Sequence, residues 1–183
     1  MTGPLNGIRI VDLTAMVSGP LATMMLADQG AEVIKVENPS GGDFTRSAAN
    51  RQGNVSASFL NNNRNKKSVA LNLKEPAGRE ALLKLVATAD VFVQNFRPGV
   101  IDRMGLGEDE LRKVAPNLIM VSISGFGDTG PFAQRPVYDP LIPALSGLAT
   151  VQAGTAERPP PLVRTILPDN STGVVRAHPL PPP

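Results

Sequence analysis

Only a few types of reactive side chain are available in this sequence. Its 183 residues include no cysteine and a single histidine, His178. This composition excludes disulfides, thiolate nucleophiles, zinc–thiolate sites and metal sites built on paired histidines. Chemistry must therefore come from carboxylates, hydroxyls, amides and arginines, and we expect no bound metal.

Two arginines follow a strongly apolar run near the middle of the chain. Residues 91–93 read as a buried strand that a Pro-Gly turn stops before a short helix. In an open parallel sheet, ligands bind outside the carboxyl ends of the strands. At such an edge Arg97 and Arg103 could contact phosphates, while Phe96 and Met104 cover a flat ring or an apolar arm. The alternative is a solvated loop whose arginines pair with surface acids.

Alternating strands and helices would position these side chains. We expect strands at 8–13, 31–37, 66–73, 91–93 and 118–123, and helices at 20–29, 76–89, 100–104 and 107–114. Pro20 and Gly30 mark the two ends of the first helix. The alternation predicts an α/β fold with a Rossmann-like, doubly wound, mostly parallel sheet. The first strand–helix unit lacks G-x-G-x-x-G, which argues against a dinucleotide cofactor.

The remaining segments are less regular. We expect a long loop at 38–65 with a short helix around 57–61, a glycine- and proline-rich loop after Ser124, a helix at 139–149, a linker at 157–161 and an extended segment at 162–167. The last ten residues, 174–183, end in three prolines and are poor in helix signals. We expect the segment after Asp169 to find no partner to pack on.

Charge and hydropathy restrict the partners. Lysine and arginine number 18 against 16 aspartates and glutamates, and aromatic residues make up 4% of the chain. The balance and the lack of stacking residues argue against nucleic acid, and the short basic cluster at 63–67 does not change this. There is no apolar run long enough to cross a membrane and no secretory signal, so we expect a cytoplasmic protein.

Several blocks, in order, resemble the class III coenzyme A transferases. This family includes formyl-CoA transferase and carnitine CoA-transferase and is homologous to alpha-methylacyl-CoA racemase. The blocks are Gly7-Ile8-Arg9-Ile10-Val11-Asp12-Leu13-Thr14, Ser18-Gly19-Pro20, residues 26–37, Gly41-Gly42-Asp43, Asn63-Arg64-Asn65-Lys66-Lys67-Ser68, Gln94-Asn95-Phe96-Arg97-Pro98-Gly99, Met104-Gly105-Leu106, Ser124-Gly125-Phe126-Gly127 and Pro168-Asp169. Each block is weak alone, but the ordered set is specific.

The resemblance implies a coenzyme A site. Coenzyme A would be a co-substrate, with no tightly bound cofactor, and an acyl-CoA and a carboxylic acid would be the substrates. The residues that match the coenzyme contacts of the family are Val17, Leu71, Asn95, Phe96, Arg97, Arg103 and Met104. Asn38 stands where some members carry a basic contact residue. The cluster at 63–67 would shape the coenzyme entrance, with a solvated turn as the alternative.

The resemblance places the catalytic carboxylate at Asp169. A carboxylate at a loop-to-helix junction is expected to stay ionised and exposed, so it could attack a thioester carbonyl. An acyl-aspartyl anhydride and an aspartyl-CoA thioester would follow, and the incoming acid would collect the coenzyme. From the residue type alone, Asp169 could simply cap the N-terminus of a helix.

Tyr138 separates two chemistries of the superfamily. Racemases that resemble this chain have a histidine before the aspartate at this point and use it to move the α-proton. Here the pair is Tyr138-Asp139, and a tyrosine with an ordinary pKa near ~10 is a poor base at neutral pH. We therefore expect a CoA-transferase, with Tyr138 lining the acyl pocket or serving as a structural tyrosine. The alternatives are an acyl-CoA racemase or isomerase, and a non-catalytic truncated remnant.

Members of this family are longer than this chain. We expect a coenzyme-binding, incomplete large domain at 1–150, a linker with the catalytic aspartate at 151–173, and an atypical tail at 174–183. A second, smaller domain would be only begun, as in a truncated or frame-shifted product. The interlocked homodimer that the resemblance implies for full-length relatives would then not form, and apolar surface around 140–148 would be exposed.

Overall fold

Five parallel strands form the central sheet of the protein, which a computed structural model describes over residues 3–48, 50–53, 55–155 and 157–178. The order is β5-β2-β1-β6-β7. The strands are β1 (Arg9–Leu13), β2 (Glu32–Glu37), β5 (Lys67–Ala70), β6 (Val91–Gln94) and β7 (Ile119–Ser122). Ile10 of β1 is in register with Val33 on one side and with Val91 on the other. The strand order reverses between β1 and β6, which is the point where such sheets bind ligands.

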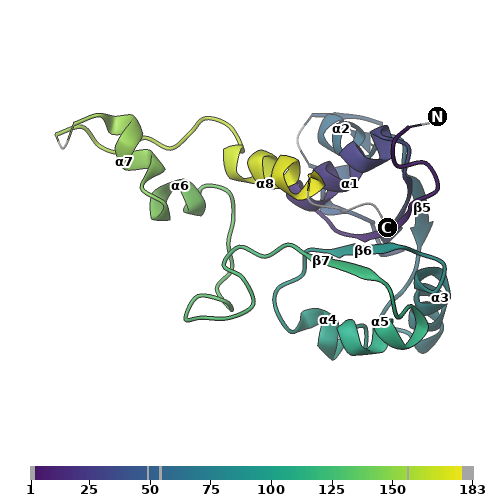
Figure 1. The fold of residues 1–183 in the computed structure, drawn as a ribbon. Helices are drawn as coiled ribbons and strands as arrows, with labels where there is room; N and C mark the ends of the chain where they lie inside the picture. Colours follow the sequence, from purple (N-terminus) through teal and green to yellow (C-terminus); the bar gives the residue numbers. More distant parts are fainter. Residues whose placement is uncertain (1–2, 49, 54, 156, 179–183) are drawn as a thin grey trace.

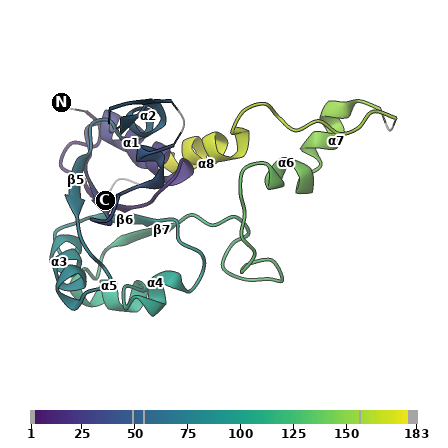
Figure 2. The ribbon, with the colours of Figure 1, turned by 180° about the vertical axis from the view of Figure 1, so that it is seen from behind.

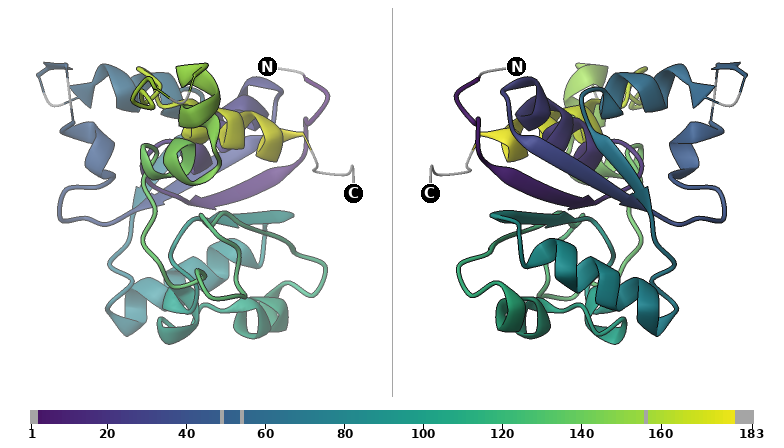
Figure 3. Two further views of the ribbon diagram at one scale, coloured as in Figure 1. Left: turned by 90° about the vertical axis from the view of Figure 1, so that its left-hand side faces the viewer. Right: turned by 90° about the vertical axis from the view of Figure 1, so that its right-hand side faces the viewer.

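Helices cover both faces of the sheet (Figure 1). α1 (Ser18–Asp28) and α8 (Leu167–Ala177) lie on one face, and α3 (Pro76–Val86), α4 (Val100–Arg103) and α5 (Glu108–Val114) lie on the other. The side views in Figure 3 show the same two helical layers with the sheet between them. The prediction of a doubly wound parallel α/β fold is confirmed.

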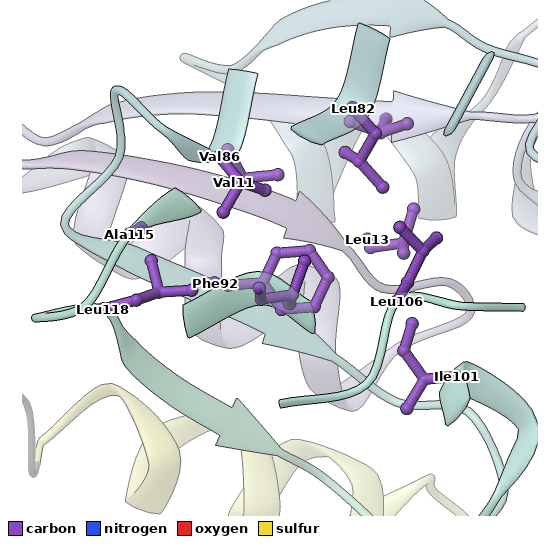
Figure 4. Packing of buried hydrophobic residues seen from close by; sticks show 11 residues of the cluster. Val11, Leu13, Leu82, Val86, Phe92, Ile101, Leu106, Ala115 and Leu118 are labelled. Atoms are coloured by element: carbon purple, nitrogen blue, oxygen red, sulfur yellow. The ribbon is translucent and has the colours of Figure 1, made fainter. Parts of the chain in front are cut away.

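The core consists of two clusters because successive strand residues point to opposite faces. Val11 and Phe92 pack with Leu82 and other residues of the α3 and α5 layer, as Figure 4 shows. Their sequence neighbours Ile10 and Val91 pack with residues of α1 on the opposite face. Burying each large apolar side chain stabilises the fold by roughly 1.5–3 kcal/mol.

The end of the chain is helical as far as Ala177. α8 lies against α1, and Gly173 allows the close approach: a Cβ atom at this position would lie 2.8 Å from Cδ2 of Leu21. The expectation that the segment after Asp169 finds no packing partner is wrong, and so is the expectation of little helix for residues 174–177. α1 supplies the apolar face that the local sequence could not reveal. Residues 179–183 lie outside the described part.

The predicted helix at 139–149 is instead two short helices. α6 (Leu141–Leu145) and α7 (Leu148–Ala153) are separated by Gly147, whose φ of 81° ends the first helix. Both helices stand away from the sheet and its helical layers in Figures 1 and 2. Leu141 is 40% exposed and Leu145 is 58% exposed. In the single chain, apolar side chains around 140–148 are therefore exposed, as expected.

The segment after β2 is more ordered than the predicted long loop. It contains the 3-10 helix η1 (Phe44–Arg46), a hairpin of β3 (Arg51–Gln52) and β4 (Val55–Ser56), and α2 (Ala57–Asn63). The hydroxyl of Ser56 accepts the N–H of Phe59 at 3.0 Å and so caps α2. The short helix around 57–61 was predicted; the hairpin was not.

Glu37, at the carboxyl end of β2, anchors this segment and makes the stability of the protein sensitive to acid. Burial alone would raise its pKa, but hydrogen bonds from Arg46, from the N–H of Asp43 and from Ser68 outweigh burial and lower the pKa to about 2. The folded-state pKa lies below the unfolded value of 4.5. Ionised Glu37 therefore stabilises the fold by about 3 kcal/mol above pH 4.5, and this contribution is lost as the pH falls towards 2.

We expect Glu37→Gln to remove most of this dependence. The free energy of unfolding, measured in urea between pH 3 and 7, should fall steeply with acid in the wild type and less steeply in the variant. Glu110→Gln, on the exposed side of α5, is the matched control and should behave like the wild type. Equal slopes for the wild type and Glu37→Gln would contradict the assignment.

Within the described residues, no helix combines the length and the apolar character needed to span a membrane.

Candidate functional site

A cleft of about 560 Å³ opens at the carboxyl edge of the sheet. Its walls come from the loops that follow β1, β6 and β7, from the start of the α6–α7 arm and from the first turn of α8. The loops after β1 and β6 flank the place where the strand order reverses, so the cleft lies where the topology predicts a ligand site. Segments as distant in sequence as Met16 and Asp169 meet in its lining.

Asp169 lies in the first turn of α8 and lines the cleft. Ile166 occupies the N-cap position, so Asp169 does not cap the helix. The N–H of Asp169 donates to Oδ1 of Asp139 at 3.0 Å. Burial, and then the nearby carboxylate of Asp139, raise the pKa of Asp169, while a hydrogen bond from Ser18 partly lowers it. Asp169 is of intermediate exposure, so the expectation of an exposed carboxylate is met only in part.

The loop between β1 and α1 forms one wall and is held from two sides. The side chain of Asn95 donates to the carbonyl of Ala15 at 2.7 Å and accepts its N–H at 3.0 Å. Oδ1 of Asp43 accepts the N–H of Met16 at 3.2 Å. Met16 has a φ of 73°, a conformation unusual for a residue with a side chain, and its partners fix it there. The wall facing the cleft is therefore preorganised.

Beneath this loop lies a buried network of charges. Nζ of Lys66 donates to Oδ2 of Asp12 at 3.0 Å, to the carbonyl of Pro20 at 2.8 Å and to Oδ1 of Asn63 at 2.9 Å. Burial lowers the pKa of Lys66 to about 8, although Asp12 opposes this shift. Burial by itself would raise the pKa of Asp12, but Lys66 and neighbouring groups outweigh it and lower the pKa.

A second buried ion pair supports the same loop. Lys35 comes from β2, and its Nζ lies 3.1 Å from Oδ2 of Asp43. The same ammonium donates to the carbonyl of Thr14 at 2.7 Å. Because both charged side chains are almost fully buried, the pair fixes the loop rather than meeting a ligand.

The basic cluster at 63–67 is solvated only in part. Asn63 and the side chain of Lys66 are buried, whereas Arg64 and Lys67 are exposed and pair with Asp28 and Glu32. The sequence showed the charges, but only the fold shows that acidic partners already neutralise them.

The predicted coenzyme contacts divide into two groups. Asn95, Phe96 and Arg97 line the cleft. The structure places Val17, Leu71, Arg103 and Met104 outside that lining. Leu71 and Met104 pack against the core cluster on the α3 face, Val17 is buried, and Arg103 is exposed on α4 near Gly99. Contact with a coenzyme stays a prediction for all seven.

Tyr138 lines the cleft and is 68% exposed. This exposure does not fit a half-buried structural tyrosine, and contact with an acyl group stays a prediction. Met16, Ser18 and Arg135 also line the cleft, and the sequence analysis did not single them out as site residues. The Ser-Gly-Pro block was the available signal for Ser18; no local pattern marked Arg135.

Within the described part of the chain, no group of three or more histidine, cysteine, aspartate or glutamate side chains is placed to hold a metal ion. The chemistry that this geometry offers is that of a half-buried carboxylate beside hydroxyl groups and arginines.

Comparison with known proteins identifies the relatives of this fold. Residues 5–178 match the family CoA-transferase family III. Succinyl-CoA:glutarate CoA-transferase of Mus musculus is 46% identical over 172 residues, which are 93% of this chain and 39% of the relative. Acetyl-CoA:oxalate CoA-transferase of Acetobacter aceti is 45% identical over 158 residues, covering 86% of this chain and 40% of the relative.

A solved structure extends the comparison to three dimensions. The crystal structure of a CAIB/BAIF family protein from Brucella suis superposes with a TM-score of 0.88 at 36% identity. The match covers 97% of this chain and 48% of that protein. The chain thus spans less than half the length of these relatives.

Proposed function

Because this chain belongs to CoA-transferase family III, we propose that it carries the nucleophile and part of the coenzyme site for the transfer of coenzyme A from an acyl-CoA to a carboxylic acid. The observation that carries the proposal is the position of Asp169, half-buried in a cleft at the carboxyl edge of the sheet with a raised pKa. A partly desolvated carboxylate is a stronger nucleophile than a fully hydrated one.

Covalent transfer proceeds in four balanced steps. The Asp169 carboxylate attacks the thioester carbonyl, the C–S bond breaks and an acyl-aspartyl anhydride forms with release of the CoA thiolate. The thiolate attacks the aspartyl carbonyl, which releases the first acid and leaves an aspartyl-CoA thioester. The carboxylate of the second acid attacks this thioester and expels the thiolate again. The thiolate finally attacks the new acyl carbonyl, giving the new acyl-CoA and free Asp169.

The residues around Asp169 have different roles in this scheme. The carboxylate of Asp139 accepts the N–H of Asp169 and so fixes the backbone there. Its negative charge also raises the basicity of the Asp169 carboxylate. Arg97 suits a phosphate of the coenzyme, and Phe96 suits its apolar parts. No step needs a histidine base, which agrees with tyrosine at position 138. Val17, Leu71, Arg103 and Met104 would contact coenzyme A beyond this cleft.

The free acid that receives coenzyme A is proposed to be dicarboxylic. The names of the two relatives compared above pair succinyl-CoA with glutarate and acetyl-CoA with oxalate, so the free acid is a dicarboxylate in both, whereas the acyl group differs. Two arginines on the walls of the cleft provide positive charge for such anions.

Isotope exchange tests the proposal directly. The purified chain is incubated with succinyl-CoA and labelled glutarate, and we expect label to appear in glutaryl-CoA without deuterium entering the α-carbon from heavy water. Deuterium wash-in without label transfer would identify a racemase. If neither label transfer nor deuterium wash-in is observed, these 183 residues are a non-catalytic remnant. That result would refute the proposed activity for this chain.

A further inference from the structure

Arg135 lines the cleft, and its side chain packs on an aromatic ring of the same loop. Its guanidinium carbon lies 4.5 Å from the centroid of the Phe132 ring, and the Phe132 ring lies 5.7 Å from that of Phe126. The N–H of Arg135 also donates to the carbonyl of Phe132 at 2.8 Å, which closes the turn between them. An aromatic face attracts a guanidinium and limits its conformations, so Arg135 is presented to the cleft before any ligand arrives.

This guanidinium has no anion of its own. Among the residues that the structure describes, Arg135 forms no ion pair, whereas Arg46 and Arg64 are paired with Glu37 and Asp28. Planar guanidinium groups bind carboxylates through paired hydrogen bonds. An oriented, unpaired arginine on a cleft wall has the properties of a receptor for an anionic ligand.

The position of Arg135 indicates which anion. It follows β7 and shares its loop with Tyr138, the predicted acyl-pocket residue, whereas Arg97 follows β6 among the residues predicted to hold the coenzyme. The two cations therefore come from different loops of the cleft, one beside predicted coenzyme contacts and the other beside the predicted acyl-pocket residue.

We propose that Arg135 is the specificity residue of the acid site and binds the second carboxylate of a dicarboxylic substrate while the first reacts at Asp169. This inference rests on the proposed CoA-transferase function. The phosphates of coenzyme A are the rival anions, and a monocarboxylic acid would leave Arg135 without a partner.

The test compares acids that differ by one carboxylate. For the wild type and Arg135→Gln, kcat/KM is measured with succinate and with butyrate as acceptor. Loss of a charged hydrogen bond of about 1.5–3 kcal/mol corresponds to roughly a 10- to 150-fold fall with succinate, and we expect less than a twofold change with butyrate. Arg135→Lys should recover part of the loss. Arg158→Gln, an exposed arginine outside the cleft lining, should match the wild type.

Equilibrium dialysis against labelled succinate, butyrate and coenzyme A gives a readout that does not require turnover. We expect Arg135→Gln to weaken the binding of succinate at least tenfold and to leave coenzyme A binding unchanged. Unchanged succinate binding, an equal loss for butyrate, or a loss confined to coenzyme A would each overturn the proposal. If the wild type transfers no coenzyme A but binds succinate in a way that depends on Arg135, the proposed transferase activity is refuted and the proposed role of Arg135 is not.

Discussion

Replacing Asp169 with asparagine is expected to reduce the rate of CoA exchange by roughly 10⁴-fold or more, which is typical for the loss of a covalent nucleophile. The amide keeps the shape of the side chain but cannot form the anhydride. Label exchange between succinyl-CoA and glutarate measures the rate. Asp169→Ala serves as a second variant, because it cannot revert to aspartate by deamidation.

The stability of the Asp169 variant separates loss of chemistry from loss of fold. The pKa of Asp169 is higher in the folded chain than its ordinary value of 3.8, so the folded state binds the proton more tightly and ionisation at neutral pH disfavours folding. Asp169→Asn should therefore unfold at pH 7 with a free energy equal to or above that of the wild type. If Asp169→Asn is inactive but at least as stable as the wild type, the carboxylate of Asp169 serves the chemistry and lowers the stability of the fold.

Two further experiments test the role of Asp169. Brief incubation of the wild type with acyl-CoA should add the mass of the coenzyme, less water, to the peptide that contains Asp169. Asp109→Asn, at an exposed position on α5, is the control and should exchange coenzyme at the wild-type rate. Undiminished exchange by Asp169→Asn would remove the basis of the proposed mechanism.

Lys66→Met is expected to cause the largest loss of stability, about 3–5 kcal/mol, because it leaves the carboxylate of Asp12 buried without its nearest cation. The Lys66 side chain is 2% exposed, and its ammonium also satisfies the carbonyl of Pro20 and the amide oxygen of Asn63. Methionine fills a similar volume, so the loss reports on charge and hydrogen bonds rather than on a cavity. Urea unfolding at pH 7 measures it.

The double variant Asp12→Asn/Lys66→Met gives the pairwise part of this effect. Removing both charges should restore a large share of the stability, since the penalty arises from one unpaired buried charge. Lys84→Met, at an exposed ion pair on α3, should change the stability by less than about 1 kcal/mol. A loss for Lys66→Met no larger than for Lys84→Met would show that the network does not support the fold.

Local patterns along the chain were enough to predict the sheet, its helical layers and the family. The apolar runs at 31–37 and 91–93, the helix boundaries at Pro20 and Gly30, and the alternation of strands with helices were sufficient for a doubly wound α/β sheet, because hydrophobic periodicity reflects which face of each element is buried. The ordered motifs were sufficient for the family. Both depend on residues close together in the chain.

Which side chains contact one another across the fold could not be predicted from local patterns. Asn95 holds Ala15 across 80 positions, and Asp139 contacts Asp169 across 30, so neither pairing leaves a local pattern. The burial of Lys66, which looked like part of a solvated basic cluster, likewise depends on Asp12 from the first strand. Burial and the nearby carboxylate of Asp139 together raise the pKa of Asp169. These properties arise from desolvation and from charges brought together by packing, which no single segment of the chain contains.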